Sequence, residues 1–220
     1  MLLAVQFLAA LTQGIWIRGG GLLTLVFYIL KFIGFSYRSA LDPDSNFFVS
    51  FLGFTFGVGL CEELCKALPL IWYYHSCDRL SWRGACRWGL ATGAGFGVAE
   101  GITYCADFYN GVHIGDIYVI RFISCVGLHA IWSASVGIML YKHQGLIQDG
   151  KPWHDLVLPL LMIVSVPMVL HGLYDTLLKM QLNEMALVAA VVSFAWLAWL
   201  IESMRDLERK AAAAAELPAA

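Results

Sequence analysis

The chain has 220 residues, of which 60% are hydrophobic and 14% are charged, and its formal net charge is -2. Soluble domains carry about 25% charged residues, and a compact soluble domain of this size cannot bury so much apolar surface. The composition excludes a disordered chain, a coiled coil and a disulfide-stapled secreted module, and the net charge gives no basis for binding nucleic acid.

Charged residues divide the sequence into apolar runs close to the length of about 20 residues that a helix needs to cross a bilayer. In chain order the runs are 2–17, 21–37, 47–74, 85–106, 117–141, 156–178 and 183–203. The first run is short for a span. We expect helices, because lipid admits only helices and closed barrels and these runs do not alternate. The sequence predicts an all-α, polytopic transmembrane helix bundle with about seven spans.

Lys and Arg residues collect on one side of the predicted membrane. That side carries Arg18, Arg79, Arg83, Arg87, Lys142, Lys151, Arg205, Arg209 and Lys210, and the opposite side carries Arg38, Arg121 and Lys179. Basic loops stay in the cytoplasm. We therefore expect the C-terminus in the cytoplasm and the N-terminus outside, or inside if the first run does not span. The expected domains are a single integral-membrane domain over 1–205 and a cytoplasmic tail over 206–220.

Small residues recur at every fourth position of two predicted helices. One stripe is Gly89, Gly93, Gly97 and Gly101, and the other is Gly53, Gly57, Cys61 and Cys65. Such stripes let a neighbouring backbone approach closely. The six cysteines form no CxxC pair, so we interpret them as small buried hydrophobic residues.

Ionisable residues also occur deep inside the run that reads GLCEELCKALPL. A charge at the centre of the bilayer costs about 2.5–3.5 kcal/mol on insertion scales, so such groups are expected to be functional or paired. Lys66 follows Glu62 and Glu63 by one helical turn and can pair with either. Adjacent carboxylates project about 100° apart on a helix. The two glutamates are therefore expected to do different jobs.

Three further runs carry ionisable groups of this kind. Glu100 ends the segment FGVAE, His129 lies within GLHAIW, and His171 and Asp175 form an i,i+4 pair in HGLYD. That spacing lets Asp175 accept a hydrogen bond from the His171 ring. A buried bridge with two helix-linking histidines is the purely structural interpretation, but the insertion cost of so many groups favours a function.

In this order on successive predicted helices, these segments resemble the motifs of a known family. EELCK at 62–66, FGVAE at 96–100, HAIW at 129–132 and HGLYD at 171–175 look like the EExxK, FxxxE, HxxW-like and HxxxD motifs of the PrsW family of intramembrane proteases. The wider superfamily includes the CAAX prenyl endopeptidases and bacteriocin-immunity membrane proteins, which usually show EExxxR, FxxxH and HxxxN. Lys66, Glu100 and Asp175 favour the PrsW branch.

The resemblance implies an integral protein of the bacterial plasma membrane. Its activity would be a metal-dependent endopeptidase that cuts a membrane-anchored protein, such as an anti-sigma factor, near the extracytoplasmic side. Substrate and lipid bilayer are then its expected partners, with no nucleic acid and no oligomeric state assigned. We expect zinc as cofactor, with His129 and His171 as nitrogen ligands and either Glu100 or Glu63 as the third ligand.

The remaining groups are expected to supply the other needs of amide hydrolysis, which are an activated water and a proton for the leaving amine. One of Glu62 and Glu63 would be the general base, Lys66 would hold the other carboxylate, and Asp175 would orient His171 or complete the ligand shell. In a metal-free alternative, a glutamate activates the water directly and His171 with Asp175 faces the oxyanion.

Two other classes of function stay open at this point. A proton-coupled transporter could pass protons along Glu62, Glu63, Glu100 and His129, and a non-catalytic membrane scaffold could use the same residues for packing. An enzyme predicts converging ligands in a closed cavity, whereas a transporter predicts a continuous polar path to both sides.

Overall fold

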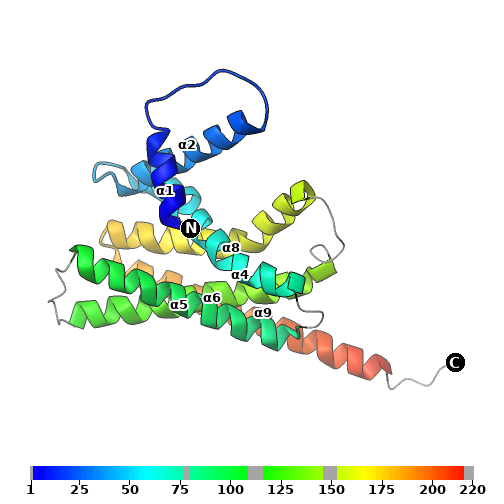
Figure 1. Ribbon diagram of the computed structural model, residues 1–220. Coiled ribbons are helices and arrows are strands. Elements are labelled where there is room, and N and C mark those ends of the chain that lie inside the picture. Colours follow the sequence, from blue (N-terminus) through cyan, green and yellow to red (C-terminus); the bar gives the residue numbers. More distant parts are fainter. Residues whose placement is uncertain (1, 77–79, 109–115, 146–152, 216–220) are drawn as a thin grey trace. The chain divides into compact units, whose positions relative to one another are not determined.

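The computed structural model describes residues 2–76, 80–108, 116–145 and 153–215, and every long regular element in these ranges is a helix. The elements are α1 (Leu2–Leu11), α2 (Leu22–Leu41), α3 (Phe47–Gly53), the π-helical segment η1 (Phe54–Gly59), α4 (Leu60–Ser76), α5 (Trp82–Phe108), α6 (Asp116–Lys142), α8 (Trp153–Lys179) and α9 (Asn183–Ala215) (Figure 1). Because α3, η1 and α4 are continuous, the described part contains seven long helices. The all-α prediction is confirmed.

Five stretches are both long and apolar enough to cross a membrane. They are Leu22–Leu41, Phe47–Tyr74, Ser124–Lys142, Asp155–Lys179 and Asn183–Ala215. The ten residues of α1 rise only about 15 Å, half the thickness of the hydrocarbon core, which is about 30 Å. The 27 residues of α5 are long enough by length. The helices thus form an integral membrane protein with about the predicted number of spans.

The chain divides into two compact units. Unit 1 comprises Met1–Leu68 and Val157–Ala190, and unit 2 comprises Pro69–Leu156 and Val191–Ala220. Helices α4, α8 and α9 each contribute residues to both units. The side chains of Cys77 and Cys105, which the sequence predicts to be buried, lie outside the described residues.

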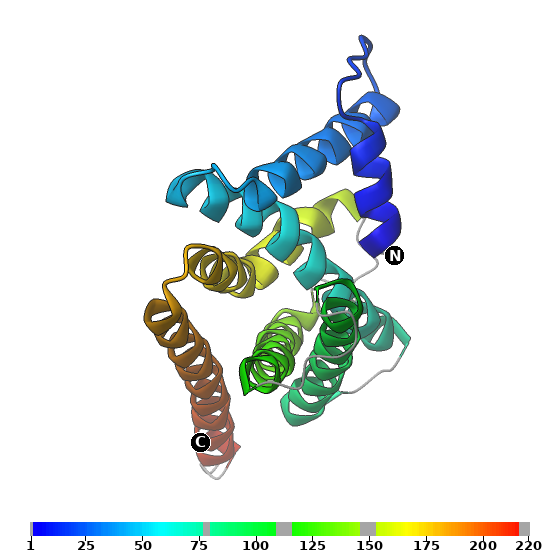
Figure 2. The same ribbon diagram turned by 90° about the vertical axis from the view of Figure 1, so that its left-hand side faces the viewer.

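Glycines on α3 and η1 bring α2 close in unit 1. A Cβ atom on Gly53 would lie 2.6 Å from the backbone nitrogen of Ala40, and one on Gly57 would lie 2.9 Å from that of Tyr37. Figure 2 shows α2 running along this segment. On another side, a Cβ atom on Gly59 would lie 2.7 Å from the carbonyl oxygen of Met168 in α8. The predicted stripe therefore works as a packing surface.

The second glycine stripe joins α5 to α6 in unit 2, and these helices run side by side in Figures 1 and 2. A Cβ atom on Gly89 would overlap the carbonyl oxygen of Ser133, and one on Gly93 would overlap that of His129. One on Gly97 would lie 2.7 Å from the Cα atom of Val126. The predicted close approach along this stripe is confirmed at these three positions.

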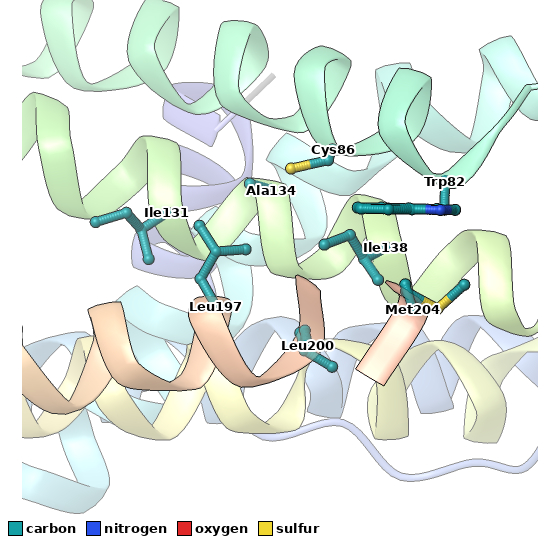
Figure 3. Close-up of a cluster of buried hydrophobic side chains, with 8 residues drawn as sticks. All are labelled: Trp82, Cys86, Ile131, Ala134, Ile138, Leu197, Leu200 and Met204. Atoms are coloured by element: carbon teal, nitrogen blue, oxygen red, sulfur yellow. The ribbon is translucent and has the colours of Figure 1, made fainter. Parts of the chain in front are cut away.

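Helix α9 completes the core of unit 2. Figure 3 shows the buried cluster of Trp82, Cys86, Ile131, Ala134, Ile138, Leu197, Leu200 and Met204 from α5, α6 and α9. Beyond it, Glu208 accepts hydrogen bonds from the Trp82 indole over 2.6 Å and from both terminal nitrogens of Arg83 over 2.6 and 2.7 Å. Of the predicted tail, residues 206–215 continue α9, and 216–220 lie outside the described residues.

Candidate functional site

Helix α4 places the three ionisable side chains of the EELCK segment in the interior of unit 1. The exposed fractions are 5% for Glu62, 0% for Glu63 and 2% for Lys66. The Nζ atom of Lys66 donates to Oε1 of Glu63 over 2.5 Å. The sequence left both glutamates open as partners of Lys66, and the structure shows this ion pair with Glu63.

His171 on α8 joins these groups, also within unit 1. Its Nδ1 atom lies 3.1 Å from Oε1 of Glu63. Its Nε2 atom lies 3.3 Å from Oδ2 of Asp175 and 3.7 Å from Oε2 of Glu62. The contact between His171 and Asp175 that their i,i+4 spacing predicts is present. A single imidazole is therefore bordered by three carboxylates.

The first cluster comprises Glu62, Glu63, Lys66, His171 and Asp175. Its donor atoms suit a cation. Three carboxylates face one Lys and one imidazole, and within the described residues Oε2 of Glu63 is buried without a hydrogen-bond partner. In a low-dielectric surrounding, such an excess of acceptors must be balanced by protons or by a metal ion. Carboxylate oxygen and imidazole nitrogen are both zinc ligands.

A second cluster lies within unit 2, between α5 and α6. The Nε2 atom of His129 lies 2.5 Å from Oε2 of Glu100, and the thiol of Cys125 lies 3.4 Å from the same oxygen. One candidate ligand atom from each of the three residues lies within 4.8 Å of the other two. His129 is 3% exposed, whereas the side chain of Glu100 is 20% exposed. The cluster is thus partly open at the carboxylate.

The aromatic residues of the motifs surround the second cluster. The Phe96 ring of FGVAE lies 5.2 Å from the His129 ring, and the Trp132 ring of HAIW lies edge-on at 5.6 Å, both measured between centroids. The Trp132 indole donates to Ser193 over 3.0 Å, which ties it to α9. These rings hold the imidazole in a largely apolar surrounding.

The glycines of α5 explain why the second cluster can form. Gly93 lies against the backbone of His129, and Gly97 lies against the backbone of Val126, next to Cys125. Without side chains at these two positions, α6 approaches close enough for its polar groups to reach Glu100. The stripe therefore positions the polar groups of the cluster as well as packing the two helices.

Sequence reasoning missed Cys125 as part of this cluster. All six cysteines were interpreted as small hydrophobic residues, and this holds for Cys61 and Cys86, which are 6% and 8% exposed. The available signal was spacing, because Cys125 precedes His129 by four residues and so shares its helix face. The cysteines were interpreted only by the CxxC pattern, and that pattern does not reveal a Cys and a His four residues apart.

Comparison with known proteins decides how these clusters are interpreted. Residues 9–200 match the PrsW family of intramembrane metalloproteases. The chain belongs to this family. No curated protein and no solved structure matches the chain.

As a PrsW family member, the protein is an intramembrane protease, which favours the enzyme over the transporter and the scaffold. The match spans all four motifs and residues of both units. Membership implies a metal ion, a membrane-protein substrate and the bilayer as surroundings. The carboxylate, thiol and imidazole groups of the second cluster fit a metal ion by their chemistry and spacing.

Proposed function

We propose that this PrsW family protease hydrolyses a peptide bond of a membrane-anchored, anti-sigma-factor-like protein in the bacterial plasma membrane. A water activated by a glutamate would be the nucleophile, with zinc as cofactor. The observation that carries the proposal is the gathering of the motif residues into two carboxylate–histidine clusters, one in each unit.

Glu62 is the general base in this proposal, and Glu63 is a positioning residue. Glu63 is held by Lys66 on one side and by Nδ1 of His171 on the other. An ion-paired carboxylate that also orients a ring is poorly suited to accept a proton from water. Glu62 lies on the Nε2 side of the same imidazole, where it could take a proton from water and later give it to the leaving amine.

Asp175 is a second carboxylate on the Nε2 side of His171. The Asp175 carboxylate lies 3.3 Å from Nε2 of His171, and its side chain is 24% exposed. It is therefore the most exposed of the three carboxylates around this ring. In this position Asp175 would orient the His171 ring or complete the ligand shell of the metal.

Glu100, His129 and His171 are the proposed metal donors, an assignment that rests on donor chemistry and family membership. The contact of Glu63 with Nδ1 of His171 agrees with it, because metal-binding histidines usually donate their other ring N–H to a carboxylate. When bound, zinc acidifies a water ligand and polarises the scissile carbonyl group.

The proposal is tested by cleavage of a membrane-anchored substrate in proteoliposomes that contain the full chain. We expect Glu100→Gln, His129→Ala and His171→Ala each to lose most of the rate while the proteins stay folded, because residues that act as one unit fail together. Glu202→Gln and His143→Gln are matched controls from outside the clusters. Wild-type rates in the first three variants would contradict the proposal.

The metal assignment has its own readout in the zinc content of the same purified proteins. We expect zinc in the wild-type protein, its loss from His129→Ala and a reduced zinc content in His171→Ala, which removes one of the donors. Full proteolysis with the zinc removed by a chelator would instead support the glutamate-activated water without metal.

A further inference from the structure

Cys125 adds a sulfur donor to two of the proposed metal donors. From this cluster we infer that α5 and α6 bind a thiophilic divalent cation, of the class of Cd²⁺, Co²⁺ or Zn²⁺, through Glu100, Cys125 and His129 together. The inference shares Glu100 and His129 with the proposed function and extends it by a thiolate ligand. It does not involve unit 1, since all three residues belong to unit 2.

Hydrogen bonds already hold the three candidate ligand side chains close together. The three candidate ligand atoms lie within 4.8 Å of one another, with sulfur to oxygen at 3.4 Å and nitrogen to the same oxygen at 2.5 Å. A four-coordinate cation bonds to sulfur at about 2.3 Å and to nitrogen or oxygen at about 2.0–2.2 Å. Small side-chain rotations would therefore suffice to place the three atoms around one ion.

The donors come from a firmly packed pair of helices. Cys125 and His129 are one turn apart on α6, so their side chains share a face. The Gly97 carbonyl lies 3.9 Å from the Cys125 sulfur, and Gly93 and Gly97 keep the two backbones in contact. Such a scaffold presents ligands that are already close together, which reduces the entropy lost on binding.

Sulfur decides which cations the site prefers. Thiolates select soft or borderline ions, whereas carboxylates and water suit Mg²⁺ and Ca²⁺. Binding would deprotonate Cys125 and release its proton to the solvent, and the hydrogen bond between Glu100 and His129 would give way to bonds from each residue to the ion. The apolar rings of Phe96 and Trp132 beside His129 would strengthen these bonds by excluding water.

The test uses Co²⁺ as the probe, because a cobalt–thiolate bond gives a near-ultraviolet charge-transfer band. We expect the full-length protein in detergent to show this band on titration with Co²⁺. Cys125→Ser keeps a hydroxyl that can donate to Glu100, but it should lose the band and weaken Co²⁺ binding by more than about 100-fold, the upper end of what loss of an outer-shell partner costs. The matched control, Cys86→Ser in the apolar cluster of α5, should keep the band.

A second measurement needs no substitution. Bound Cd²⁺ should slow alkylation of Cys125 by iodoacetamide in the wild-type protein, as followed by peptide mass mapping, and should leave the rate at Cys65 unchanged. An unchanged alkylation rate at Cys125 would overturn the inference, and so would a Cys125→Ser protein with the Co²⁺ spectrum and affinity of the wild type.

His171→Ala separates this inference from the proposed function. The variant should keep the Co²⁺ band, because the three donors lie in unit 2, although the proposed function expects it to lose proteolysis. Loss of the band in His171→Ala would overturn the three-donor site. An active His171→Ala protein with an intact band would instead contradict the proposed function alone.

Discussion

Glu63 is the residue on which the first cluster depends. It has no exposed surface, and it contacts both Lys66 on its own helix and His171 on α8. Its carboxylate therefore fixes the position of the imidazole, while Lys66 compensates its charge. Removing the charge of either Glu63 or Lys66 would leave the other in the interior without its partner in this ion pair.

We predict that Lys66→Met destabilises the protein by about 3–5 kcal/mol, the cost of leaving one member of a buried ion pair uncompensated. The double variant Glu63→Gln/Lys66→Met should recover a large part of this loss, because both charges are then absent. Thermal unfolding in detergent measures both. A Lys66→Met protein as stable as the wild type would show that the pair does not hold the interior together.

At this scale the sequence predicted a contact where both residues lie on one helix at a fixed spacing, and did not predict contacts between helices. The spacing of His171 and Asp175 was sufficient to predict their contact, because an i,i+4 pair meets on any helix. The partner of Lys66 stayed open, since both glutamates are within its reach on one helix. Cys125 was missed because its neighbour Glu100 is 25 residues away in the sequence, on another helix.

Helix α5 shows how elements are held together without large side chains. Its glycines at positions 93 and 97 contact the backbone of α6, whereas Gly95 has no atom within 4 Å of where its Cβ would be. The three glycines thus lie on the same helix but have different neighbours. This difference offers a matched pair of substitutions.

We predict that Gly93→Ala destabilises the protein and lowers activity, although alanine favours a helix by about 1 kcal/mol over glycine. The added methyl group would overlap the carbonyl oxygen of His129 and push α6 away from Glu100. Gly95→Ala should be neutral or stabilising. Thermal stability and proteolysis of the two variants provide the comparison, and equal behaviour would show that the close contact of α5 with α6 does not matter.

A second pair of substitutions tests which face of α9 is buried. Leu200 is 2% exposed within the cluster of Figure 3, whereas Trp199 is 56% exposed. We predict that Leu200→Ala costs about 2–5 kcal/mol, as expected for a cavity in a packed core. Trp199→Ala should cost less, about 0.5–1.5 kcal/mol, because it loses the stacking of its exposed ring on Trp196. The reverse order in thermal unfolding would mean that α9 packs through its other face.

The helices themselves were largely predictable from apolar runs and charges. The run 47–74 corresponds to α3, η1 and α4, and the run 117–141 corresponds to α6. The π-helical segment η1 was not predicted, because a single π-helical stretch within an α-helix leaves the pattern of apolar residues almost unchanged. Within this segment, Gly57 faces α2 and Gly59 faces α8.

For the whole molecule, the basic residues predict an orientation in the membrane. Reporters inserted at Leu80 and after the C-terminus should both be cytoplasmic, because Arg79 and Arg83 lie near the first site and Arg205 and Arg209 near the second. Four helices, α5, α6, α8 and α9, separate the two sites, and an even number of crossings returns the chain to the same side. Reporters on opposite sides would show that one of these helices does not cross.

The central claim is that this PrsW family protease hydrolyses peptide bonds with Glu62 as the base. The most direct test is the rate at which Glu62→Gln cleaves a membrane-anchored substrate in proteoliposomes, compared with the wild type at equal amounts of folded protein. Because glutamine fills the same space without accepting the proton, we predict a loss of about 10²–10⁴-fold with no change in melting temperature. A Glu62→Gln protein that cleaves at the wild-type rate would contradict the claim.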